Sequence, residues 1–81
     1  MNKTPTITQL MNLGFEIVTC YEHDNFITQR RKKGRLTTEK TWDKDNEHKE
    51  VSFEVQLDDS DWTQITFHEL NVLDLIFNKA K

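Results

Sequence analysis

The sequence predicts an α+β fold, a single antiparallel β-meander of three to four strands with an N-terminal and a C-terminal helix packed on one face. Helix-capping signals stand near both ends of the chain, and segments that alternate between apolar and polar residues lie between them. The connections are short, which favours antiparallel neighbours. Because one face of such a sheet is polar, both helices are expected on the other face, in the order α-β-β-β-(β)-α.

Length and composition indicate one domain spanning residues 1–81, of which 35% are hydrophobic and 31% charged. The single Cys20 excludes an internal disulfide framework. We expect a cytoplasmic protein, because no apolar run resembles a signal peptide or a membrane span. The net charge of −3 is uneven: residues 1–40 carry seven Lys or Arg against four Asp or Glu, and residues 41–81 carry four against ten.

The first helix is expected to begin at Thr4, with Pro5 in its first turn, or at Thr6, with Gln9 completing a capping box. Gly14 ends it in the left-handed conformation. The segment 15–22 then alternates as a strand, with Phe15, Ile17, Thr19 and Tyr21 on one face and Glu16, Val18, Cys20 and Glu22 on the other. On this pattern Cys20 is a packed thiol rather than a nucleophile.

Residues 26–32 and 35–42 are predicted to form a hairpin around Lys33 and Gly34. We favour a three-residue loop with a bulge, which pairs Arg30 with Leu36 and places Phe26, Leu36 and Trp42 on one face. The alternative, a two-residue loop, sets Ile27 against Lys40.

A polar loop is expected at 43–49, followed by a strand at 51–57 with Val51, Phe53, Val55 and Leu57 facing inward. Residues 62–65 form either a short edge strand or an extended approach to the last helix.

The last helix is predicted over 66–80, because Thr66 and Glu69 form a capping box. Its apolar stripe comprises Phe67, Leu70, Leu73, Phe77 and Ala80. The opening motif L-x-x-L-G-F-E (10–16) and the closing motif E-L-x-x-L-x-x-I (69–76) resemble small uncharacterised α+β accessory proteins of bacteriophages, prophages and mobile elements. The resemblance implies a bacterial or phage setting and assigns no functional residue.

Residues of the kinds that carry catalysis or bind metals occur without the spacing that such chemistry needs. His23, His48 and His68 have no partner at a zinc-like spacing. The acidic segment 43–54 departs from a calcium loop, since His48 stands where the loop requires Gly. We therefore expect no enzyme, no metal site and no cofactor.

Two surfaces remain as candidates for binding. Val72, Leu75 and Ile76 lie off the centre of the helical stripe and form a candidate interface for a protein partner or a homodimer. At the hairpin tip, a basic run provides candidate phosphate contacts, namely Arg30, Arg31, Lys32, Lys33 and Arg35. The same cations are also typical guards of an exposed strand against aggregation. The leading hypothesis is thus a small binding or regulatory protein that acts through protein contact, and nucleic-acid binding is the alternative.

Overall fold

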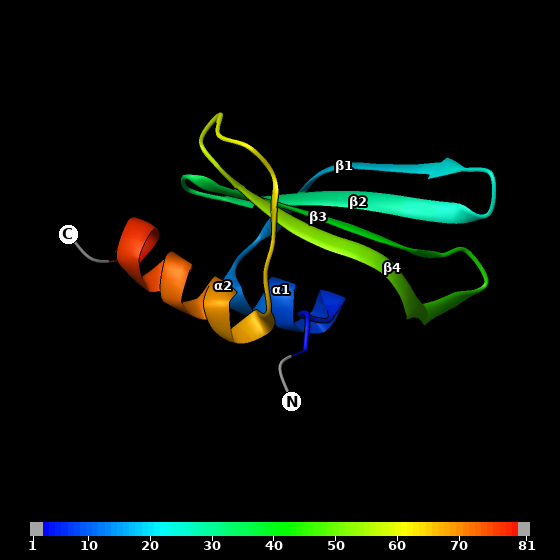
Figure 1. The fold of residues 1–81 in the computed structure, drawn as a ribbon, viewed down its shortest axis with the longest axis horizontal. Coiled ribbons are helices and arrows are strands. Elements are labelled where there is room, and N and C mark those ends of the chain that lie inside the picture. Colours follow the sequence, from blue (N-terminus) through cyan, green and yellow to red (C-terminus); the bar gives the residue numbers. More distant parts are fainter. Residues whose placement is uncertain (1–2, 80–81) are drawn as a thin grey trace.

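The computed structural model describes residues 3–79, and all of their side chains except those of 47, 48 and 79. Five strands form one antiparallel sheet in the order β1-β2-β3-β4-β5, and both helical segments lie on the same side of it (Figure 1). This arrangement confirms the predicted class, with one strand more than the three to four expected. The elements are α1 (Ile7–Leu13), β1 (Glu16–His23), β2 (Phe26–Lys33), β3 (Leu36–Asp43), β4 (Asn46–Leu57), β5 (Thr63–Gln64), α2 (Phe67–Asp74) and the π-helix η1 (Leu75–Lys79).

Both helix starts follow the capping signals in the sequence. The Thr6 hydroxyl accepts from the Gln9 N–H at 3.1 Å, and the Gln9 side chain accepts from the Thr6 N–H at 2.9 Å. Thr66 and Glu69 repeat this reciprocal pair at α2, at 3.2 and 2.8 Å. Gly14 ends α1 at a φ of 96°, which a residue with a Cβ rarely adopts. The capping predictions are confirmed, with Thr6 rather than Thr4 as the first cap.

The core lies between the sheet and the helices. Its buried apolar residues come from α1, the β1 approach, β3, β4 and α2, and they are Leu10, Phe15, Leu36, Phe53, Val55 and Leu70. Within the predicted helical stripe, Leu70 is buried and Phe67, Leu73 and Phe77 are half-buried. Ala80 lies outside the described residues. The stripe therefore packs on the sheet as its spacing predicts.

The predicted register of the central hairpin is wrong. Lys33 pairs with Leu36, so the loop consists of Gly34 and Arg35 alone, and Ile27 pairs with Trp42. Only the first of the two loop residues has a positive φ, 57° at Gly34, which is the pattern of a type II′ turn. Leu36 and Trp42 still share the helix-facing side, whereas Phe26 lies on the opposite face.

β-bulges overturn two further expectations of strict alternation. In β1 the register shifts between Ile17 and Thr19, so Val18 is an extra residue. Ile17, Val18 and Cys20 are all exposed, which corrects the prediction of a packed thiol. The helices cover only part of the sheet, and the half that carries the β1–β2 turn extends beyond them (Figure 1).

In β4 the register shift falls between Glu50 and Ser52 and leaves Val51 exposed instead of inward. The expected polar loop at 43–49 is also shorter than predicted, because β4 begins at Asn46 and only Lys44 and Asp45 form the turn. None of the described helices is long and apolar enough to span a bilayer.

Candidate protein-binding surfaces and the hairpin tip

The outer flank of the last helix exposes three large apolar side chains. Val72 is 42% exposed, Leu75 59% and Ile76 52%. Val72 belongs to α2, and Leu75 and Ile76 open the π-helical segment η1. Their exposure confirms the prediction that they lie off the buried stripe. We call these three residues the helix flank.

The edge strand β1 is a second exposed apolar surface. β1 is hydrogen-bonded only to β2, and all eight of its residues are exposed. Ile17, Val18 and Tyr21 each expose at least half of their surface. Along β1 the backbone groups that point away from β2 have no partner strand among the described residues.

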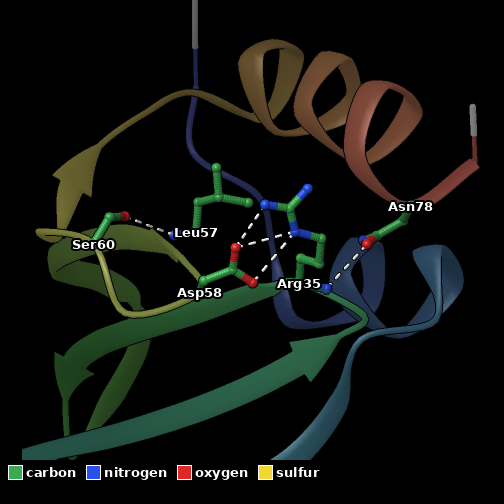
Figure 2. Close-up of polar contacts among 5 residues, drawn as sticks. All are labelled: Arg35, Leu57, Asp58, Ser60 and Asn78. Atoms are coloured by element: carbon green, nitrogen blue, oxygen red, sulfur yellow. Dashed lines mark hydrogen bonds and ion pairs between the residues drawn. The ribbon is translucent and has the colours of Figure 1, made fainter.

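Polar side chains of the last helix fix the tip of the β2–β3 hairpin. The Asn78 amide donates to the Lys33 carbonyl at 2.8 Å. It also accepts from the Arg35 N–H at 3.1 Å (Figure 2). Asn78 also donates to the buried Asp74 at 3.0 Å, and Asp74 accepts from the Lys33 ammonium at 2.9 Å. The helix end and the turn are therefore one hydrogen-bonded unit.

Gly34 allows this close approach. A Cβ on Gly34 would lie 2.2 Å from Asn78 Oδ1 and 2.9 Å from Asn78 Cγ, both closer than real contacts. Its φ of 57° also disfavours a side chain. Two independent constraints thus require glycine at the tip.

On the other side of the tip, Arg35 pairs with Asp58 at the end of β4. The guanidinium donates to both carboxylate oxygens at distances of 2.6–3.3 Å (Figure 2). These hydrogen bonds lower the pKa of Asp58 and raise that of Arg35. Asp58 follows Leu57, whose N–H donates to the Ser60 hydroxyl at 3.2 Å and shapes the turn. Arg35 also lies 5.2 Å over the Phe77 ring.

The basic run does not project as a group, which corrects that part of the sequence interpretation. Arg31 is buried and donates to the Phe15 carbonyl at 3.0 Å. Arg30 pairs with Glu39 at 2.7 Å, while Lys33 and Arg35 pair with Asp74 and Asp58 as described above. Lys32 is exposed, and none of the ion pairs among the described residues includes it. In addition to the Arg35 hydrogen bonds, its charge contributes to lowering the pKa of Asp58. The surface that these cations offer to phosphate is therefore smaller than five charges suggest.

Buried polar residues on the helix-facing side of the sheet were missed at the sequence level. The Lys40 ammonium donates to Glu50 at 2.5 Å and to the Pro5 carbonyl at 3.1 Å. Asp74 is 1% exposed and lies one position after Leu73 and four after Leu70, so it shares the buried face of α2. That spacing could have predicted the burial of Asp74 from the sequence. For Lys40, alternation with Leu36 and Trp42 along β3 could have predicted that it faces the helices.

The described residues contain no group of three His, Cys, Asp or Glu side chains that could hold a metal ion. His23 Nε2 shares a hydrogen bond of 2.9 Å with the Thr28 hydroxyl, and its ring lies beside those of Tyr21 and Phe26. His68 is exposed on α2. An open hollow of about 370 Å³ lies between the hairpin tip and η1, but the Lys33 and Arg35 that line it are already paired.

Comparisons with family models, curated proteins and solved structures found no match.

Proposed function

We propose that this chain is a small non-enzymatic binding or regulatory protein that acts through contact with another protein. The observation that carries the proposal is the helix flank, where three large apolar side chains are 42–59% exposed on consecutive turns of one helix. Isolated exposed apolar residues are common on soluble proteins, but a group on one helical surface is typical of interaction sites.

The energetics support contact as the role of this flank. Full burial of an aliphatic side chain is worth about 1.5–3 kcal/mol relative to full exposure, and Leu75 and Ile76 each retain more than half of their surface in water. A partner that covered the flank would recover this contribution. Helical apolar residues spaced at three and four are the pattern that enters a partner's groove or packs on a second helix. We expect this role in the cytoplasm of a bacterial or phage system, as the two end motifs suggest.

Nucleic-acid binding remains the alternative, and exposed Lys32 is the observation that favours it. Arg30 and Arg35 are also partly exposed, so three cations lie near the hairpin tip. Against this alternative, Glu39 and Asp58 already neutralise two of them. The sequence pI of about 5.5 is also lower than the basic pI that nucleic-acid-binding domains usually have. We therefore rank protein contact first.

Quantitative affinity purification from the source cells tests the proposal. The tagged wild-type chain is compared with a flank variant, Val72→Ser/Leu75→Glu/Ile76→Ser, and with Val51→Glu as the control. Val51 is a matched control because it is an exposed aliphatic residue, 57% exposed, on a different element. We expect proteins that the wild type and the control recover equally and the flank variant loses. Equal recovery by all three chains, each with the wild-type circular dichroism spectrum, would contradict the proposal.

A further inference from the structure

β1 carries fewer edge guards than the opposite side of the sheet. Exposed edge strands are usually guarded by Lys or other charged side chains, Pro, bulges or short length, and of these β1 has only Glu16, Glu22 and the Val18 bulge. β1 is eight residues long and contains neither Lys, Arg nor Pro. At the other side, β5 covers β4 at Glu54 and Val55, and Lys49 lies in the uncovered part of β4. β1 is therefore the edge that is best suited to accept another strand.

The Val18 bulge determines which β1 side chains share a face. Pairing with β2 places Ile17, Cys20 and Glu22 on the helix-facing side. By the same pairing, the outer side carries Glu16, Thr19, Tyr21 and His23. Without the bulge, strict alternation would put Glu16 and His23 on opposite faces. With it, the two ends of the strand point the same way.

This facing makes β1 complementary to itself. If a second β1 lies antiparallel with Cys20 opposite Cys20, Glu16 lies opposite His23 and Ile17 opposite Glu22. The bulged pair Val18 and Thr19 then lies opposite Tyr21. In every pair both residues belong to the same face, as an antiparallel ladder requires.

We propose that a second copy of this chain pairs with β1, antiparallel and about a two-fold axis at Cys20, so that two five-stranded sheets become one continuous sheet. The inference goes beyond the proposed function, because β1 and the helix flank are separate surfaces.

Charge and length favour this register over its neighbours. The Cys20-centred register uses all of Glu16–His23 and brings the Glu16 carboxylates next to the His23 rings. A register centred on Tyr21 leaves Glu16 and Ile17 beyond the end of the partner strand. One centred on Thr19 sets Glu16 against Tyr21 and leaves Glu22 and His23 beyond the end of the partner strand.

Cys20 provides a direct test of the register, because it is the only cysteine in the chain. Directly opposed residues of antiparallel strands have Cα atoms about 4.5–5.5 Å apart, which lies within the range of about 4.4–6.8 Å that a disulfide spans. Mild oxidation with diamide is expected to convert the protein into a covalent dimer. The test variant is Val18→Glu, which keeps Cys20. The new carboxylates at position 18 of the two copies would add charge repulsion between the paired β1 strands.

Val51→Glu is the matched control, since Val18 and Val51 are both bulge valines and are 56% and 57% exposed. Light scattering on the reduced proteins gives the mass before oxidation. We expect twice the 9.7 kDa chain mass for wild type and Val51→Glu, and the monomer mass for Val18→Glu. Disulfide formation should fall at least tenfold in Val18→Glu. Tyr21→Glu repeats the test from the other member of the pair.

Two outcomes would overturn the inference. The β1 dimer is excluded if the wild type is a monomer at millimolar concentration and diamide cross-links it no faster than the Val18→Glu variant. That result would leave the proposal of a foreign partner on the helix flank unaffected. A dimer that Leu75→Glu dissociates and Val18→Glu leaves intact also overturns it, while supporting self-contact through the helix flank.

Discussion

Replacement of Gly34 by alanine is expected to destabilise the fold mainly through its effect on Asn78. The new Cβ would occupy the position of Asn78 Oδ1, 2.2 Å away, so the Asn78 side chain must move. When it moves, it loses its hydrogen bonds to the Lys33 carbonyl, the Arg35 N–H and Asp74.

The magnitude follows from two contributions. A left-handed φ costs a residue with a Cβ about 1–2 kcal/mol. The three displaced hydrogen bonds contribute about 0.5–1.5 kcal/mol each, and their loss is partly compensated by water, so we take about 2 kcal/mol for the group. Gly34→Ala should therefore cost about 3–4 kcal/mol, a large part of the 5–15 kcal/mol that typically stabilises a folded protein.

A double-mutant cycle separates the two contributions. Asn78→Ala alone should cost about 2 kcal/mol. In the Asn78→Ala background, Gly34→Ala should cost only the backbone contribution of about 1–2 kcal/mol, which leaves a coupling of about 2 kcal/mol. Urea denaturation at equilibrium gives the four free energies of unfolding. If Gly34→Ala costs the same in both backgrounds, within about 0.5 kcal/mol, the Asn78 side chain does not fix the hairpin tip.

Three further predictions concern the Thr66 cap, the stability of the fold at acidic pH, and the exposed cations near the hairpin tip. Thr66→Ala should lower the free energy of unfolding by about 1 kcal/mol, since it removes one half of the capping box; an unchanged urea midpoint would contradict this. Arg35 lowers the pKa of Asp58, so this pair stabilises the fold above the ordinary pKa of 3.8 and stops doing so as the pH falls through the lowered value. In Asp58→Asn the melting temperature should therefore fall less steeply than in wild type as the pH decreases below 3.8, and high salt should reduce this difference. The same pH dependence in both proteins would show that the Arg35–Asp58 pair does not contribute to stability. If duplex DNA binds at the exposed cations Arg30, Lys32 and Arg35, the log–log salt slope should be about −2 to −3, whereas a slope near −5 would require the buried Arg31 to become accessible.

The ends of the fold could be predicted from the sequence because their signals are local. Thr6 with Gln9, and Thr66 with Glu69, each lie within one turn of the helix that they cap. The exposure of Leu75 followed from the helical period in the same way. Whether a partner covers the helix flank depends on a surface that is not part of this chain.

The hairpin register could not be predicted by the same reasoning, because it depends on pairs that are distant in sequence. Matching apolar residues across the hairpin assumed that the helix-facing side is apolar. In the structure this side holds Lys33 and Lys40, whose carboxylate partners Asp74 and Glu50 come from α2 and β4. The asparagine that closes the Gly34 turn, Asn78, is likewise 45 residues away from Lys33.

The bulges were missed for a related reason. A strictly alternating segment such as 15–22 predicts one buried face only if something covers that face. Here the helices end before the β1–β2 turn, so Cys20 remains exposed although it lies on the helix-facing side (Figure 1). Tyr21 is exposed because the Val18 bulge places it on the outer side.

Site-specific photo-cross-linking in the source cells can show whether the helix flank contacts another protein. A benzophenone amino acid replaces Leu75 on the helix flank in one chain and Val51 on β4 in another, two positions of 59% and 57% exposure. We expect discrete cross-linked protein species from position 75 that position 51 does not give. Identical patterns from the two positions, or cross-links from position 51 alone, would contradict contact through the helix flank.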